Sequence, residues 1–380
     1  MPFNISIVEL LIISLLFVTA LNCTLTYFCC TKSLKVLEEN NSIGKAVNKL
    51  RIFDQYLLSK INILIALFYF VMSYFFVNTY LNTYYVFFLS CLLSFVLTLI
   101  TTFVSRLCYC YTCNVLLETK LNEFECLLIN FKELMSFYFP FILMSLVVPS
   151  IYLIDVPMMY KNIICIASLL VIVIIWIILA PNIIKLKYNA IKIPKNTMLE
   201  HRLALLLEAH GIKKYKLYYW DTSRSKEANA MVSGIRKHYL FISSYLIESV
   251  TLPELETVIT HEIGHIKNRH VIKMMIGKIF LTICVLGAIM IPLIFKFNSF
   301  NKILFYFASI IIISLEMLIG IAIERKYEKE ADYYASCYND PVLFANALKK
   351  VTPYEEEENS IDELFQSHPS LKSRVENIKK

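Results

Sequence analysis

The sequence predicts an α-helical integral membrane protein with seven transmembrane helices and a polar domain that contains a small β-sheet. Composition and the placement of histidine support this fold class. Of the 380 residues, 57% are hydrophobic and only 18% are charged, against about 25% charged in an ordinary soluble domain. All seven histidines lie beyond residue 200. The first part of the chain is therefore expected to be a membrane anchor, and the histidine-bearing part the working domain.

Long apolar runs predict the individual spans. A helix that crosses a hydrocarbon core about 30 Å thick needs about 20 apolar residues. Stretches of this kind occur at 6–28, 61–80, 84–104, 135–154, 162–180, 277–296 and 303–323. A buried helix of a soluble protein can imitate one such run, but not the whole set.

Lysine and arginine predict the orientation of these spans. They gather after spans one, three, five and seven and are scarce in the other connections. Because positive residues mark the cytosolic side, the N-terminus is expected in the lumen or periplasm and the C-terminus in the cytosol. The membrane would be the endoplasmic reticulum in a eukaryote or the inner membrane in a bacterium. The net charge of +7 suits an anionic leaflet and does not indicate nucleic acid, and no obligatory protein partner is evident.

The spans divide the chain into four segments. Residues 1–180 form a five-span membrane region, and 181–276 form a first cytosolic segment. A two-span hairpin at 277–323 leads to a second cytosolic segment at 324–380. The 11 cysteines are an odd number, and on the cytosolic side they are expected to be reduced, with lipidation of juxtamembrane thiols as the alternative.

The first cytosolic segment is expected to hold a small sheet between two helices. Three runs rich in aromatic and β-branched residues predict strands at 214–220, 228–234 and 238–243. A helix is expected at 195–210 and another at 251–270. Thr251 caps the second helix, Pro253 suits its first turn, and Glu254 complements its dipole.

The second of these helices carries the sequence H-E-x-x-H. His261 and His265 are four residues apart and therefore project from one helix face, where two imidazoles can share a zinc ion. Glu262 follows the first histidine, as does the general base of zinc metallopeptidases. The competing interpretation is a polar helix face at the cytosolic boundary. If the metal site exists, His270 either supports a ligand or lies on the surface.

A catalytic zinc ion requires a third protein ligand, and "ERKYEKEADYYA" follows the last span. Glu328 is the candidate ligand, and Asp332, four residues later, can orient a zinc-bound imidazole. Glu330 points to another helix face and competes weakly as a ligand. A charged helix with i, i+4 pairs is the alternative.

Four motifs together resemble those of the integral-membrane gluzincins, the group of the type I CAAX prenyl proteases and the HtpX quality-control proteases. They are "THEIGH", the later R-x-x-E-x-x-A-D, the terminal "SHPSLKSR" and "RSKEANAMVSG" at 224–234. Five spans before the first motif resemble the prenyl proteases, since HtpX-type proteins have two. The motif resemblance covers only about 220–380.

The resemblance implies roles for individual residues. It implies one Zn²⁺ per chain on His261, His265 and Glu328, and Glu262 as the catalytic base. The remaining implied residues are His368 at the catalytic site, Asp332 and Arg325 behind the ligands, and Asn229, Ala230 and Arg374 at the substrate. For Asn229 the alternative is an ordinary turn residue, and for the "HPS" at His368 a loop after a helix.

The chain departs from the prenyl-protease pattern at three places. Ile266 replaces a Trp, Glu324 replaces a Ser, and "SSYLI" at 243–247 replaces a D-T-L stretch. None of these departures touches the expected metal site, but each weakens the transfer of the family's substrate specificity to this chain. Glu316, inside the seventh predicted span, either lines a water-filled chamber or packs against a polar neighbour.

The sequence thus predicts a membrane-embedded zinc metalloendopeptidase that removes the C-terminal tripeptide from prenylated CAAX proteins. A broader HtpX-like protease of membrane-protein quality control is the alternative, and a non-enzymatic transporter or scaffold the remote one. The expected partners are a peptide or protein substrate, prenylated in the first interpretation, and the lipid bilayer.

Overall fold

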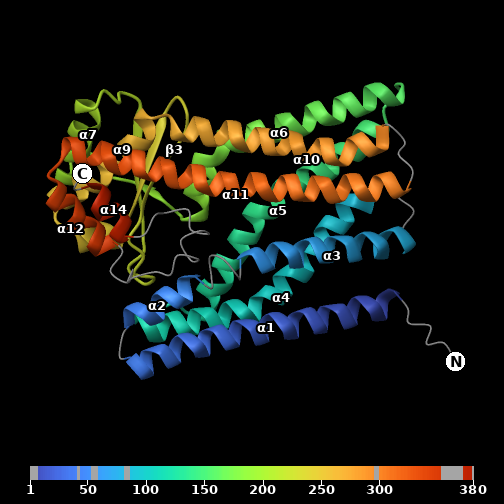
Figure 1. Ribbon diagram of the computed structural model, residues 1–380, viewed down its shortest axis with the longest axis horizontal. Helices are drawn as coiled ribbons and strands as arrows, with labels where there is room; N and C mark the ends of the chain where they lie inside the picture. Colours follow the sequence, from blue (N-terminus) through green and yellow to red (C-terminus); the bar gives the residue numbers. More distant parts are fainter. Residues whose placement is uncertain are drawn as a thin grey trace. The chain divides into compact units, whose positions relative to one another are not determined.

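A computed structural model describes the chain at residues 7–40, 43–52, 59–80, 86–294, 299–351 and 371–378. The chain divides into two compact units, Met1–Ile172 and Val173–Lys380 (Figure 1). The first unit is helical, and the second combines helices with a small sheet. The four-segment division expected from the sequence stays a prediction.

The first unit is organised around helix α4. Its helices are α1 (Ile7–Asn40), α2 (Ile43–Ile52), α3 (Ser59–Tyr80), α4 (Val86–Leu117) and α5 (Glu123–Tyr152), followed by the start of α6 (Met158–Lys187). Helix α4 packs against α1, α3 and α5. Polar side chains bond across these contacts: Thr101 Oγ1 lies 2.8 Å from Tyr69 Oη, and Asn22 Nδ2 donates to Ser105 Oγ at 3.0 Å. Such bonds hold helices together where lipid removes the hydrophobic driving force.

Three of the described helices are long and apolar enough to cross a membrane: Val8–Glu39, Phe88–Leu117 and Met159–Lys187. The pieces Glu123–Ser136 and Tyr138–Tyr152, which meet at a bend of 42°, make a fourth if they form one span. Pro140 explains the bend, because it lacks the N–H that would bond to the carbonyl of Ser136. These helices match four of the expected spans.

The other three expected spans, at 61–80, 277–296 and 303–323, fall on α3, α10 (His270–Ile294) and α11 (Ser299–Tyr338). Many side chains of these helices, including that of Glu316, lie outside the described residues. The count of seven spans and their orientation stay predictions.

The second unit contains a four-stranded sheet of order β1-β2-β4-β3. The strands are β1 (Ile191–Lys192), β2 (Tyr215–Trp220), β3 (Ala230–Ser233) and β4 (His238–Ser243). Strands β2 and β4 are parallel, and the outer strands β1 and β3 are antiparallel to their neighbours. The three predicted strands are confirmed as β2, β3 and β4, whereas two-residue β1 is too short to leave a sequence pattern.

Helix α9 (Leu252–Lys267) carries the H-E-x-x-H sequence and packs on the apolar core of this unit. The expected cap is present, because Glu254 Oε2 accepts hydrogen bonds from the Thr251 N–H at 2.7 Å and hydroxyl at 2.9 Å. Ile259 and Ile263 are fully buried with the core residues of α7 (Met198–Ala209) and the sheet. The opposite face of α9 is therefore free to present polar residues.

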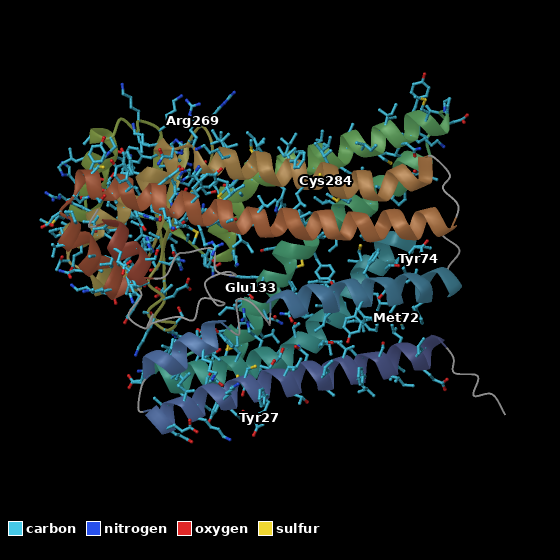
Figure 2. All side chains as sticks on the ribbon, viewed as in Figure 1. Tyr27, Met72, Tyr74, Glu133, Arg269 and Cys284 are labelled. Atoms are coloured by element: carbon cyan, nitrogen blue, oxygen red, sulfur yellow. The ribbon has the colours of Figure 1, made fainter. Side chains whose placement is uncertain are left out.

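The predicted helix 251–270 is wrong at its C-terminal end, because α9 stops at Lys267. The Asn268 N–H bonds to the Gly264 carbonyl and the Arg269 N–H to the Ile266 carbonyl, and Arg269 adopts a left-handed φ of 57°. Such a residue reverses the chain direction at a helix end. Arg269 is exposed at this turn (Figure 2), and α10 begins at His270.

Helix α11 continues without a break from Ser299 to Tyr338. It therefore joins the predicted seventh span and the predicted E-x-x-A-D helix in one element of 40 residues. Helix α11 packs against α9, α10 and α14 (Leu371–Ile378), and α12 (Pro341–Val351) packs against α9. Residues from α9, α11 and α14 consequently meet.

Candidate metal centre

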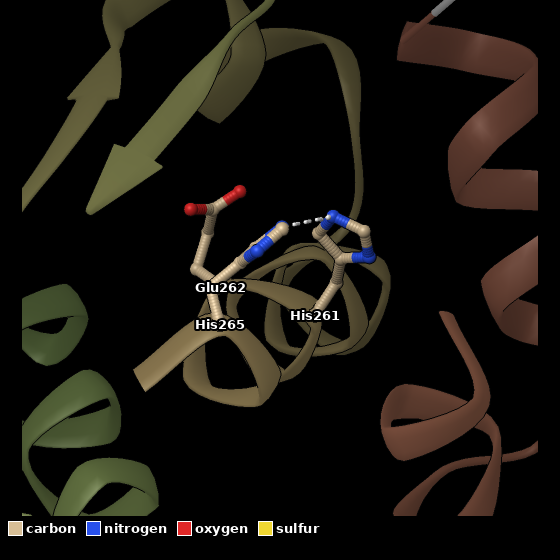
Figure 3. A group of neighbouring side chains, drawn as sticks. All are labelled: His261, Glu262 and His265. Carbon is tan, nitrogen blue, oxygen red and sulfur yellow. Dashed lines mark hydrogen bonds between the residues drawn. The ribbon is translucent and has the colours of Figure 1, made fainter. Parts of the chain in front are cut away.

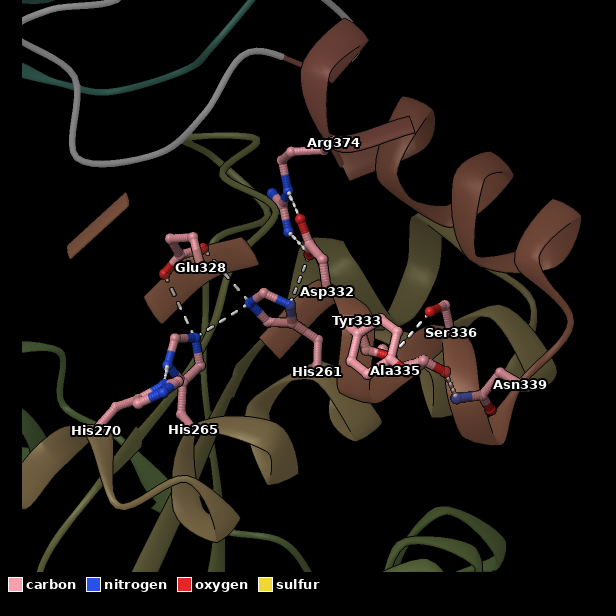
Figure 4. Close-up of polar contacts among 10 residues, drawn as sticks. All are labelled: His261, His265, His270, Glu328, Asp332, Tyr333, Ala335, Ser336, Asn339 and Arg374. Carbon is pink, nitrogen blue, oxygen red and sulfur yellow. Dashed lines mark hydrogen bonds and ion pairs between the residues drawn. The ribbon is translucent and has the colours of Figure 1, made fainter. Parts of the chain in front are cut away.

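Three predicted ligands converge where α9 meets α11. The Nε2 atoms of His261 and His265 lie 3.2 Å apart (Figure 3). The carboxylate of Glu328 reaches both, with Oε2 at 3.5 Å from His261 Nε2 and Oε1 at 3.4 Å from His265 Nε2 (Figure 4). His261 and Glu328 are buried, and His265 is half-buried.

The spacing of these atoms suits a tetrahedral metal ion. Ligand atoms at about 2.0–2.1 Å from a tetrahedral zinc ion are separated from one another by about 3.3–3.4 Å. The two imidazole nitrogens, 3.2 Å apart, are close to this value, and each lies 3.4–3.5 Å from one of the two Glu328 oxygens. Two imidazole nitrogens and one carboxylate oxygen also make the donor set of many catalytic zinc sites. The residues present therefore fit a zinc ion.

Glu262 lies beside the two histidines on α9. It is buried, and a carboxylate oxygen of Glu262 lies within 4.8 Å of ligand nitrogens of both His261 and His265. In Figure 3 its side chain stands next to the ring of His265. A carboxylate in this position can exchange a proton with a molecule bound at the centre without occupying the place of Glu328.

A buried carboxylate contacts His261 on the side of the ring away from the other proposed ligands. His261 Nδ1 lies 2.9 Å from Asp332 Oδ1. Arg374 of α14 donates hydrogen bonds to the same carboxylate from Nε at 2.9 Å and from Nη2 at 2.7 Å. Burial alone would raise the pKa of the Asp332 carboxyl, but Arg374 and His261 lower it to about 2. Asp332 is therefore charged at neutral pH and can orient the His261 ring.

The carboxylates also make this place favourable for positive charge. Burial lowers the pKa of His261, but the hydrogen bonds and charges of Asp332 and Glu328 outweigh burial and raise the pKa. A buried pocket that stabilises a proton in this way also stabilises a cation.

Gly264 and Ala331 allow the close approach of α9 and α11. A Cβ atom built on Gly264 would lie 3.1 Å from Ala331 Cα and 3.3 Å from the Ala331 carbonyl oxygen. Both of these are backbone atoms, which cannot turn aside as a side chain can. Two small residues at this crossing thus bring Glu328 within reach of the histidines, which explains the alanine of the E-x-x-A-D pattern.

We expect Gly264→Ala to destabilise the protein although alanine is the better helix former. Separating the two backbones should cost about 1–3 kcal/mol, more than the gain of about 1 kcal/mol in helix propensity. Gly277→Ala in α10 is the matched control, because its Cβ would meet nothing within 4 Å. Thermal unfolding of both variants measures the difference, and equal stabilisation of both would contradict this account.

The other predicted site residues have these positions. Asn229 directly precedes β3, where its N–H bonds to Ser243 Oγ and its carbonyl accepts from the Ser243 N–H, both at 2.9 Å. Ala230 is the first residue of β3, the edge strand next to α9. Arg325 is half-buried on α11, one turn before Glu328. His368 lies outside the described residues.

Arg374 and Glu330 make contacts that the sequence did not predict. Arg374, expected near the substrate, pairs with Asp332, and its contact with substrate stays a prediction. Glu330, expected to point to another helix face than Glu328, contacts His270: His270 Nε2 lies 2.9 Å from Glu330 Oε2. No local signal in the sequence reveals this contact, because it depends on the turn at Arg269.

Comparisons with known proteins indicate a peptidase family. Residues 194–380, which contain every site residue named in this subsection, match the model of peptidase family M48. The chain belongs to this family over that region. The resemblance to integral-membrane gluzincins is thereby confirmed, and M48 peptidases are zinc metalloproteases. With its long apolar helices, the chain is an M48 metalloprotease of the membrane-bound kind.

The individual relatives are HtpX proteases. A protease HtpX homolog of Bacteroides fragilis (strain YCH46) is 27% identical over 233 residues, covering 53% of this chain and 70% of that protein. Protease HtpX of Buchnera aphidicola subsp. Schizaphis graminum (strain Sg) is 26% identical over 188 residues, covering 40% of this chain and 63% of that protein.

A solved structure extends the likeness to the whole M48 chain. The crystal structure of S. mikatae Ste24p superposes with a TM-score of 0.64, covering 100% of this chain and 99% of Ste24p at 18% identity. At that identity the likeness concerns the fold, which includes the membrane helices outside the family match.

Proposed function

We propose that this M48 protein is a membrane-embedded zinc metalloendopeptidase in which His261, His265 and Glu328 hold one Zn²⁺. The convergence of these three side chains to within 3.5 Å of one another, with Glu262 beside them, carries the proposal. A zinc ion bound there supplies a Lewis acid that polarises the scissile carbonyl and lowers the pKa of water.

Glu262 serves as the general base and acid of this reaction. Its carboxylate takes a proton from the attacking water and returns it to the leaving amine. Asp332, itself held by Arg374, keeps the His261 ring in place through the Nδ1 contact. The scissile peptide lies beside β3, because an extended chain can add to an exposed sheet edge and this edge strand is adjacent to α9. Asn229 and Ala230, at the start of that strand, then contact the substrate.

The proposed substrates are prenylated CAAX proteins, from which the C-terminal tripeptide is removed. The order of motifs and predicted spans supports this choice, as does a fold that matches Ste24p along its whole length. Broader quality control of membrane proteins is the second candidate, and the identity with HtpX proteases over 233 residues favours it.

A pair of peptides distinguishes the two candidates. We expect a farnesylated CAAX peptide to be cleaved with at least about tenfold higher kcat/KM than its unprenylated twin, since burying two methylenes of the lipid contributes about 1.6 kcal/mol and tenfold corresponds to about 1.4 kcal/mol. The assay uses purified full-length protein in lipid nanodiscs. Equal cleavage of the two peptides would contradict prenyl specificity and favour the HtpX-like function.

A further inference from the structure

His270 is a fully buried histidine that the proposed reaction does not use. It is the first residue of α10, and the left-handed turn at Arg269 brings it back toward the end of α9. Its ring stacks on Tyr327 of α11 with centroids 4.3 Å apart and an interplanar angle of 13°. A polar ring in such a place requires partners for both nitrogens.

Both ring nitrogens of His270 have a partner. Nδ1 lies 2.9 Å from His265 Nδ1, and Nε2 lies 2.9 Å from Glu330 Oε2 (Figure 4 shows the ring of His270 directly below that of His265). A continuous line of contacts thus runs from Glu330 through His270 to His265. His261, by comparison, meets its carboxylate Asp332 directly.

The chemistry of the imidazole rings determines which atom donates and which accepts in the contacts between His265, His270 and Glu330. If Nε2 of His265 binds zinc through its lone pair, Nδ1 of the same ring carries the proton and donates it. Nδ1 of His270 must then accept, so that the proton of a neutral His270 is on Nε2 and points to Glu330. If the hydrogen bonds ran the other way, His270 Nε2 would accept from Glu330, and the Glu330 carboxyl would have to be protonated.

We propose that His270 and Glu330 are positioning residues that fix the tautomer and ring orientation of His265 and thereby raise the affinity of the zinc site, an inference that rests on the proposed zinc ligands. Helix α11 thus supports both histidine ligands. Asp332 acts on His261 directly, and Glu330 acts on His265 through His270. Neither positioning residue touches the substrate or the metal.

Two substitutions of His270 separate hydrogen bonding from packing. His270→Gln keeps one acceptor and one donor, like the neutral imidazole, but loses the aromatic ring. His270→Phe keeps a ring that can stack on Tyr327 but has neither hydrogen-bonding atom. If hydrogen bonding by His270 supports the site, His270→Gln should bind zinc more tightly than His270→Phe. If packing of the ring supports it, His270→Phe should bind more tightly.

The test is the zinc dissociation constant of the full-length protein, measured by competition with a chromophoric chelator. We expect His270→Phe to weaken binding by about 10–100-fold, the usual effect of losing a partner of a metal ligand, and His270→Gln to recover most of this loss. Glu330→Ala should weaken binding by about tenfold. Glu324→Ala, the same change on the same helix, should leave the affinity unchanged.

The inference would be overturned if His270→Phe bound zinc as tightly as the parent, or more tightly than His270→Gln. The proposed zinc site would remain valid in that case. A parent protein that binds no zinc would overturn the proposed function itself. Thermal unfolding of each variant without zinc shows whether the fold is retained, so that a loss of affinity is assigned to the site.

Discussion

Glu262→Gln should abolish peptidase activity while leaving zinc bound. The amide has the shape of the carboxylate but cannot take the proton of the attacking water, so kcat should fall by about 10²–10⁴-fold. The three proposed ligands are untouched, and the zinc content should remain one ion per chain. Peptide hydrolysis together with elemental analysis of the purified variant measures both quantities.

The control for this prediction is Glu256→Gln on the same helix. Glu256 bonds to Arg202 at 2.8 Å on the exposed side of α9, so its loss should leave kcat unchanged. A Glu262→Gln variant as active as the parent would remove Glu262 from the reaction. Loss of zinc from that variant would instead show that Glu262 acts in metal binding.

Glu328→Ala should remove zinc binding without unfolding the protein. It deletes one of three proposed ligands, and the zinc affinity should fall by more than the factor of about 10–100 that follows from losing a ligand's supporting partner. Zinc at about 100 times its Kd stabilises the parent by about 2.7 kcal/mol. The variant should lose this zinc-dependent rise in Tm.

Without zinc, Glu328→Ala should remain folded, because the change removes a side chain of the proposed metal site and leaves the apolar core of this unit intact. The Tm of the metal-free variant measures this. Glu324→Ala serves again as the comparison on α11 and should keep the full zinc effect. If Glu328→Ala binds zinc as tightly as the parent, the third ligand is a different residue.

Much of the site could be predicted because its signals are local. The four-residue spacing of His261 and His265 places both on one helix face, whatever surrounds the helix. Thr251 and Glu254 mark the start of α9 through contacts three residues apart. The three longer strands were visible for the same reason, since each contains its own alternating or aromatic pattern.

The sequence by itself therefore indicated the membrane character, the helix with two proposed histidine ligands, Glu328 as the third ligand and Asp332 as a support. Only the tertiary structure showed that Glu328 reaches both histidines, that Asp332 supports His261 in particular, and that Glu330 contacts His270, 60 residues away in the chain. The pairing of Arg374 with Asp332 joins residues 42 positions apart. Such contacts depend on the Gly264–Ala331 crossing and on the turn at Arg269, because helix packing and chain reversal, rather than sequence spacing, set which distant side chains meet.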